Sequence, residues 1–288
     1  MNTISGHTKL TALLGSPVSH SISPLMHNEA FRILGLDYIY LCFDVNEQEL
    51  PKAVEGLRAC KIRGFNLTMP NKNAITSLLD ELSPAAKLIG AVNTVVNDDG
   101  RLIGYNTDGI GFMQSVRDAG ISVKNKTITL MGAGGAGTAI CAQAALDGAS
   151  DIHLFVRKTS RFMGRTRQLA DNINQTLPCR VHIHDNEDEK ALKESLSESV
   201  LLINATSVGM APATDMSIIQ DTSLFSPSLA VADVIYNPRE TRLLAEAKAA
   251  GCKTFNGMYM LLYQGAEAFR LWTGQDMPVE PIRQKYFS

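Results

Sequence analysis

The stretch Ile128-Thr129-Leu130-Met131-Gly132-Ala133-Gly134-Gly135-Ala136-Gly137 decides the fold of this chain. An apolar run precedes the glycines, and an alanine-rich segment ending at Leu146 follows them. This order predicts a strand, a tight turn and a helix, the context in which a G-x-G-x-x-G motif binds a dinucleotide. Backbone N–H groups at the start of such a helix face a pyrophosphate, whose negative charge the helix dipole favours. The expected cofactor contacts are Gly132, Ala133, Gly134, Gly135 and Ala136; the alternative is an ordinary glycine-rich turn.

Strand and helix patterns alternate along the whole chain. After the glycine turn, strand patterns over 151–156, 180–184, 200–204, 230–235 and 252–255 alternate with helix patterns over 161–175, 187–196 and 239–250. This alternation predicts an α/β protein with parallel strands and right-handed crossovers. We expect two domains, which also suits a length of 288 residues. One is a mixed α/β substrate domain over 1–106, completed by C-terminal helices over 239–288, and the other is a Rossmann-type, doubly wound parallel sheet over 107–238.

Composition excludes several classes of protein. The chain is 45% hydrophobic and 19% charged with a net charge of −2, so neither nucleic acid nor a membrane surface is an expected partner. No apolar run reaches the roughly 20 residues that span a bilayer, and the start lacks signal-peptide character. The five scattered cysteines indicate reduced thiols, so we expect a cytoplasmic protein. The sequence leaves the oligomeric state open, with a homodimer as one alternative.

A pair of histidines, His182 and His184, raises the question of a metal site. Residues two apart on a strand share a face, so the geometry permits shared ligation. No third ligand is evident, and zinc sites use three or four protein ligands. We therefore interpret the two histidines as a surface pair and expect no metal.

The end of the second nucleotide-domain strand should determine the cofactor. An acidic residue about 20 residues past the glycines would bind a ribose 2′-hydroxyl, whereas a basic residue suits a 2′-phosphate. The chain has Arg157, Lys158 and Thr159 there and no acid. This favours NADP, because an arginine fork matches a phosphate, while NAD remains an alternative. The alternative is a solvated basic loop without a binding role.

Eight motifs in order along nearly the whole chain resemble the shikimate dehydrogenase family, and within it the quinate/shikimate dehydrogenase type. They are Ser21-Ile22-Ser23-Pro24, Asn66-Leu67-Thr68-Met69-Pro70-Asn71-Lys72, Gly90-Ala91-Val92-Asn93-Thr94, Asn106-Thr107-Asp108-Gly109, the Gly132 turn, Asn204-Ala205-Thr206-Ser207-Val208-Gly209-Met210, Asp233-Val234-Ile235-Tyr236-Asn237-Pro238 and Gly257-Met258-Tyr259-Met260-Leu261-Leu262-Tyr263-Gln264. The resemblance implies reversible reduction of 3-dehydroshikimate to shikimate with a nicotinamide cofactor and no metal, in the route to chorismate and the aromatic amino acids.

The resemblance implies that Lys72 and Asp108 form the catalytic pair. A positioned ammonium can stabilise the charge that develops on a ketone oxygen and deliver a proton to it. A neighbouring carboxylate would orient that ammonium and favour its charged form. Taken without the family, Lys72 would be an ordinary solvated lysine and Asp108 a routine helix cap.

The resemblance also implies the remaining substrate contacts. Ser21 and Ser23 correspond to the pair that binds the substrate carboxylate, although Ser23 also suits a plain N-cap. Tyr40 could add a phenolic contact or could be a core-facing strand residue. Neutral donors and acceptors suit the ring hydroxyls of the substrate, and those expected here are Thr68, Asn93, Thr107 and Gln264.

The nicotinamide side of the cofactor site follows from the later motifs. The resemblance implies contacts from Thr206, Ser207, Ile235, Tyr236 and Gly257, several of them through the backbone. The chain departs from the family after the second nucleotide-domain strand, where the common Asn-Arg pattern is replaced by Val156-Arg157. Pro70-Asn71-Lys72 resembles the quinate/shikimate type more closely, so quinate stays open as an additional substrate. Two alternatives also stay open: a dehydrogenase that prefers quinate, and a non-catalytic nucleotide-binding regulator on the same scaffold.

Overall fold

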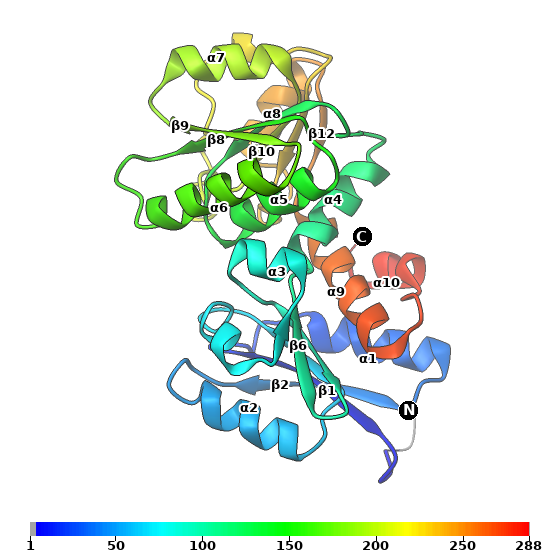
Figure 1. Ribbon diagram of the computed structural model, residues 1–288. Helices are drawn as coiled ribbons and strands as arrows, with labels where there is room; N and C mark the ends of the chain where they lie inside the picture. The colour runs from blue at the N-terminus through cyan, green and yellow to red at the C-terminus, as the bar shows by residue number, and fades with distance from the viewer. Residues whose placement is uncertain (1–3, 288) are drawn as a thin grey trace. The chain divides into compact units, whose positions relative to one another are not determined.

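The computed structural model describes residues 4–287 and divides into two compact units. Unit 1 comprises Met1–Thr107 and Leu262–Ser288, and unit 2 comprises Asp108–Leu261. The expected α/β class is confirmed: unit 1 contains a mixed sheet and unit 2 a parallel one (Figure 1).

Within the described part of unit 1, six strands form one sheet in the order β2-β1-β3-β5-β6-β4. β1 pairs in parallel with β2 and β3, whereas β5 runs antiparallel to both β3 and β6. The elements are β1 (Lys9–Gly15), α1 (Ser23–Leu34), β2 (Tyr38–Asp44), α2 (Leu50–Ala59), β3 (Gly64–Leu67), the 3₁₀ helix η1 (Ala74–Leu78), β4 (Glu81–Leu82), α3 (Pro84–Ile89), β5 (Thr94–Asp98), β6 (Arg101–Tyr105), most of α9 (Met258–Thr273) and α10 (Val279–Tyr286).

The two faces of the unit 1 sheet carry different cores because strand side chains alternate. Ala12 and Leu14 of β1 pack in one apolar cluster with Leu50 and Val54 of α2. The opposite face is aromatic and lies between the sheet and helices α1 and α9. Its buried rings include Phe31, Tyr40, Phe269 and Trp272.

The C-terminal helix α9 is fixed to this sheet by Trp272. The indole Nε1–H donates to the carbonyl of Val95 at 3.0 Å, and the ring lies where a side chain on Gly64 would be. The guanidinium of Arg63 donates to the Trp272 carbonyl at 2.8 Å and to the Asn97 carbonyl at 2.7 Å. These contacts place the preceding turns of α9 beside β3 and β5.

Within residues 108–261, six parallel strands form the sheet of unit 2 in the order β12-β11-β10-β7-β8-β9. Numbered from β7, this is the order of a Rossmann fold, with the change of direction between β7 and β10. The elements are α4 (Asp108–Asp118), β7 (Thr127–Met131), α5 (Gly135–Leu146), β8 (Asp151–Val156), α6 (Met163–Thr176), β9 (Arg180–Asp185), α7 (Glu189–Glu198), β10 (Ser199–Asn204), the 3₁₀ helix η2 (Thr222–Leu224), β11 (Ala230–Asp233), α8 (Arg242–Ala249) and β12 (Lys253–Phe255).

Helices cover both faces of the unit 2 sheet (Figure 1). Leucines of α7 and α8 share an apolar cluster with Phe155, Leu202 and Val231 of the strands. On the other face α4 and α5 lie so close that a Cβ on Gly109 would collide with the carbonyl of Ala139.

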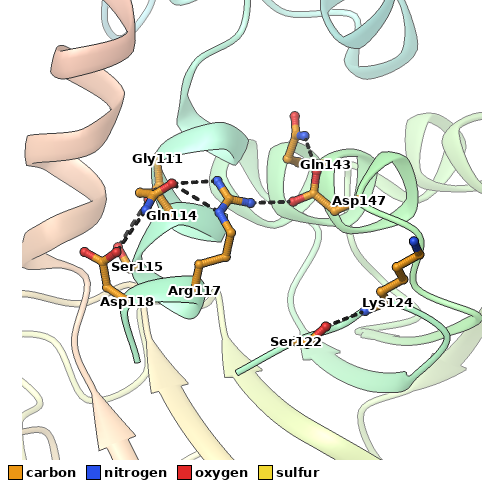
Figure 2. A network of polar contacts seen from close by, with 9 residues as sticks. All are labelled: Gly111, Gln114, Ser115, Arg117, Asp118, Ser122, Lys124, Gln143 and Asp147. Atoms are coloured by element: carbon orange, nitrogen blue, oxygen red, sulfur yellow. Dashed lines mark hydrogen bonds and ion pairs between the residues drawn. The ribbon is translucent and has the colours of Figure 1, made fainter. Parts of the chain in front are cut away.

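The ends of α4 and α5 are joined by a polar network (Figure 2). Arg117 donates to the Gln114 side chain and to the Asp147 carboxylate, the latter at 3.0 Å. Gln143 donates to the second oxygen of Asp147 at 2.8 Å. This exposed network fastens α4, the first helix of unit 2, to the helix that follows the glycine turn.

Some expected boundaries differ from the structure. The chain returns to unit 1 at Leu262, not at residue 239, because β12 pairs with β11 and α8 packs on the unit 2 sheet. Ser23 is not the N-cap of α1: the helix begins at Ser23 itself, and no side chain caps it. Residues Ala74–Leu78 form a 3₁₀ helix, and the C-terminal helices expected over 239–288 are α8, α9 and α10.

Candidate functional site

Three of the expected substrate contacts lie together in unit 1. The Asn93 amide donates to the hydroxyl of Thr107 at 3.0 Å and to the Gln264 side chain at 3.4 Å. The Asn93 oxygen accepts from the backbone N–H of Thr107 at 2.7 Å. Residues 171 positions apart in the sequence therefore share one polar cluster.

This cluster continues to Tyr40 through two residues that sequence reasoning did not single out. The Asn66 amide donates to the Asn93 carbonyl at 3.1 Å and to the Thr94 hydroxyl at 3.0 Å. The Tyr40 hydroxyl donates to the Asn66 side chain at 2.8 Å. Asn66 and Thr94 are strand residues that are buried despite being polar, and their places inside two of the quoted motifs were the available signal.

The two expected carboxylate-binding serines lie at the start of α1. The backbone N–H of Ser23 donates to the Ser21 hydroxyl at 3.2 Å, so the two residues belong to one turn. Because Ser23 does not cap the helix, its hydroxyl is not committed to that role. Burial raises the pKa of Tyr40, so its phenol is neutral, and a hydrogen bond from Ser23 opposes this shift in part.

The expected catalytic pair is divided between the two units. Lys72 follows β3 in unit 1, and its carbonyl accepts from the Val92 N–H at 2.8 Å, next to Asn93. Thr68 begins the same turn. Its N–H donates to the Leu14 carbonyl at 3.0 Å, and its carbonyl accepts from the Asn71 N–H at 2.9 Å. Asp108 is the first residue of α4 in unit 2 and is 9% exposed.

The glycine turn of unit 2 is tightly packed on one side and open on the other. Gly132 has a φ of +100°, which favours glycine, and a Cβ on Gly137 would collide with the Gly132 carbonyl. Gly134 and Gly135, by contrast, have nothing within 4 Å of an added Cβ. The start of α5 is thus closed toward the sheet and open on its outer side, which fits the phosphates of a dinucleotide. Ala133 is buried and Ala136 half-buried beside them.

The basic loop after β8 contains Arg157, Lys158 and Thr159, all exposed. Lys158 Nζ lies 2.7 Å from an oxygen of Asp185, the last residue of β9. The Lys158 ammonium lowers the pKa of Asp185, and the carboxylate raises the pKa of Lys158. Sequence reasoning missed Asp185, because nothing in the spacing shows that it pairs with this loop.

The expected nicotinamide wall is organised by a buried carboxylate, Asp233. One oxygen accepts from the Asn204 amide at 3.1 Å and the Thr241 hydroxyl at 2.8 Å, and the other accepts from the Ile235 N–H at 2.9 Å. The Asn204 oxygen in turn accepts from the backbone and hydroxyl of Thr206, at 3.0 and 2.7 Å. Two of the expected contact loops are therefore fixed to one another.

The other wall residues lie on the same two loops or next to them. Ser207 follows Thr206 and is exposed, and Tyr236 follows Ile235 with 47% exposure. Gly257 donates its N–H to the Ile235 carbonyl at 3.2 Å and packs so closely on Val234 that a side chain would not fit.

The histidines of β9 have protein partners. His184 Nε2 lies 2.9 Å from His153 Nδ1, and His182 Nε2 lies 3.1 Å from an Asp151 oxygen. Over residues 4–287, no group of three or more His, Cys, Asp or Glu side chains has a geometry suited to a metal. The same residues include no helix that is long and apolar enough to cross a membrane.

Comparisons with known proteins agree with this geometry. Residues 13–95 match the shikimate dehydrogenase substrate binding domain, and residues 257–285 match the shikimate 5′-dehydrogenase C-terminal domain. The shikimate dehydrogenase (NADP(+)) of Streptococcus pyogenes is 54% identical over 283 residues, which are 97% of each chain.

Solved structures give the same result. The shikimate 5-dehydrogenase of Listeria monocytogenes, in complex with shikimate and NAD, has a TM-score of 0.96 and 48% identity over 99% of this chain and 98% of that one. The quinate dehydrogenase of Corynebacterium glutamicum, in complex with NAD, has a TM-score of 0.86 and 31% identity over 97% and 99%. This chain belongs to the shikimate dehydrogenase family.

Proposed function

We propose that this chain catalyses the reversible, nicotinamide-dependent reduction of 3-dehydroshikimate to shikimate, as part of aromatic amino acid biosynthesis. The observation that carries the proposal is the polar cluster in which buried Asn93 bonds to buried Thr107 and half-buried Gln264. Such a set of neutral donors and acceptors suits a substrate rich in hydroxyl groups. Family membership and the 54% identity to a shikimate dehydrogenase support the same substrate.

In the proposed reaction, Lys72 moves the proton. During reduction its ammonium donates a proton to the ketone oxygen, and during oxidation the neutral amine takes the proton from the hydroxyl. Asp108 orients the ammonium and accepts a hydrogen bond from a substrate hydroxyl. The bound nicotinamide supplies or receives the hydride.

The proposed substrate contacts follow the same division of roles. Ser21 and Ser23 donate to the substrate carboxylate at the start of α1, where the helix dipole favours negative charge. Thr68, Asn93, Thr107 and Gln264 hydrogen-bond to the ring hydroxyls, and Tyr40 adds a phenolic contact. The neutral phenol can both donate and accept.

The proposed cofactor is NADP, with NAD as an alternative. The open side of Gly134 and Gly135 would hold the pyrophosphate, and the loop of Arg157, Lys158 and Thr159 would bind the 2′-phosphate. Thr206, Ser207, Ile235, Tyr236 and Gly257 would line the nicotinamide. We also propose a cytoplasmic location, which is supported by all five cysteines being free thiols.

The experiment that tests the proposal is oxidation of shikimate and of quinate, each with NADP and with NAD. Reduced nicotinamide is followed by its absorbance. We expect the highest kcat/KM with shikimate and NADP. Activity mainly with quinate would favour the second candidate, which the quinate dehydrogenase similarity supports. Folded protein that binds cofactor and oxidises neither substrate would instead favour the regulator.

A further inference from the structure

An acidic residue lies beside the loop that is proposed to bind the 2′-phosphate. Asp185 ends β9, and its register partner on the neighbouring strand β8 is Val156, directly before Arg157. The carboxyl ends of adjacent parallel strands share one edge of the sheet, where a dinucleotide binds in this fold. Asp185 is therefore at the adenosine edge of the sheet, one strand from the place where sequence reasoning looked for an acid.

The two side chains of the Lys158–Asp185 ion pair differ in exposure to solvent. Asp185 has a side chain that is 12% exposed, and its Oδ1 accepts from the Glu187 N–H at 3.3 Å. Lys158 is 82% exposed and is joined to Asp185 Oδ2 at 2.7 Å through a long side chain. The carboxylate is thus held by its surroundings, whereas the lysine can move away from it.

The basic loop after β8 has fewer unpaired positive charges than its sequence indicates. Arg157, Lys158 and Arg161 supply three cations, but the Lys158 ammonium is paired with Asp185. Glu187 and Asp188 also contribute to the raised pKa of Lys158, so their negative charges act on the same ammonium. A 2′-phosphate must compete with Asp185 for Lys158, while a neutral 2′-hydroxyl need not.

We propose that Asp185 is a specificity-determining residue that reduces the preference for NADP by withholding Lys158 from the 2′-phosphate. This inference rests on the proposed function, since it concerns the cofactor of the same site. The proposal reconciles two observations. The basic loop of this chain favours NADP, whereas two of its structural relatives were solved in complex with NAD.

The test compares wild type with Asp185→Asn, which keeps the shape of the side chain and removes its charge. Dissociation constants for NADP and NAD are measured by calorimetry without substrate, and kcat/KM is measured with shikimate. We expect Asp185→Asn to bind NADP about 5-fold more tightly, which is the upper end of the effect of one exposed ion pair. Its affinity for NAD should change less than 2-fold.

Lys158→Ala supplies the second arm of the experiment. It should weaken NADP binding, and Asp185→Asn added to it should give less than half of the gain seen in wild type. Asp221→Asn is the matched control, because Asp221 is another carboxylate of unit 2 that accepts from a backbone N–H, that of Ser223. It should leave the ratio of the two affinities unchanged.

Two results would overturn the proposal. One is an unchanged NADP-to-NAD affinity ratio in folded Asp185→Asn, with Asp185→Ser replacing it should the first variant unfold. The other is an undiminished effect of Asp185→Asn without Lys158. Because binding is measured without substrate, a chain that fails to oxidise shikimate but shows the expected shift refutes only the proposed function.

Discussion

The imidazole of His27 lies parallel to the phenol ring of Tyr40, with 4.5 Å between the ring centroids and 9° between the planes. Both residues are fully buried. The next residue, Asn28, donates to the Tyr40 carbonyl at 2.9 Å and accepts from the Tyr40 N–H at 2.8 Å. The dipeptide His27-Asn28 therefore fixes both the backbone and the ring of Tyr40, whose hydroxyl reaches Asn66.

His27 should make the stability of unit 1 depend on pH. Burial lowers its pKa from 6.5 to about 3, and neither ring nitrogen has a hydrogen-bond partner among the described residues. His27 takes up a proton near pH 6.5 in the unfolded chain and only near pH 3 in the folded chain. The unfolding free energy is therefore highest above pH 6.5 and falls as the pH drops from 6.5 toward 3. At pH 5 the expected loss is about 2 kcal/mol.

His27→Phe is the variant that tests this expectation. Urea unfolding at pH 7 and at pH 5 is followed by the fluorescence of Trp272, the only tryptophan in the sequence, which lies in unit 1. The change in unfolding free energy between the two pH values should be about 2 kcal/mol smaller in His27→Phe. His7→Phe, at an exposed position, should behave as wild type. The same pH dependence in His27→Phe and wild type would contradict the prediction.

Two glycines of the cofactor turn should respond oppositely to alanine. A methyl group on Gly137 would collide with the Gly132 carbonyl, so Gly137→Ala should lower Tm by about 5–10 °C or prevent folding. Gly135 begins α5 and has open space around it, so Gly135→Ala should retain Tm. It should nevertheless weaken NADP binding about 10-fold, since the methyl group occupies the space proposed for the pyrophosphate. Thermal unfolding and calorimetry separate the two outcomes, and unimpaired NADP binding by Gly135→Ala would place the pyrophosphate elsewhere.

Asp233→Asn should loosen the two loops of the nicotinamide wall. Both oxygens of the Asp233 carboxylate accept hydrogen bonds. In Asp233→Asn one oxygen is replaced by an NH₂ group, which cannot accept and would face at least one of these donors. We expect a loss of about 1–3 kcal/mol in unfolding free energy and a several-fold rise in KM for NADP. The KM for shikimate should stay within 2-fold, because its proposed contacts lie in unit 1 or on Asp108. Equal increases in the two KM values would show that the effect is general, and Thr241→Ser, which keeps its hydroxyl, should resemble wild type.

The fold was largely predictable from local patterns. The glycine turn, the alternation of strands and helices and the apolar strands of unit 2 all have signals within a few residues. The division at Leu262 had no such signal, because the segment from 239 to 255 reads as helix and strand in either domain. Its place was decided by pairing of β12 with β11, which is a long-range contact.

Apart from the glycine turn and the basic loop after β8, the residues of the candidate site were predicted only where the family motifs named them. Asn66 and Asp233 lie inside quoted motifs but act through hydrogen bonds to partners that are distant in the sequence. Asp185 is outside every motif, and its ion pair with Lys158 depends on the register of β8 with β9. Sequence spacing along a single strand cannot show which charges meet across two strands.

Lys72→Ala should lower kcat by about 10²- to 10⁴-fold, since it removes the group proposed to move the proton. The KM for shikimate should change less than 10-fold, because Asn93, Thr107 and Gln264 would still bind the ring hydroxyls. Lys72→Arg keeps a positive charge but holds its proton far more tightly, so it should restore shikimate binding and not turnover. Lys87→Ala is the matched control, because Lys87 is an exposed lysine of the same unit in the last turn of α3. Steady-state kinetics of shikimate oxidation measure all three variants, and a near-normal kcat in Lys72→Ala would assign the proton transfer to another group.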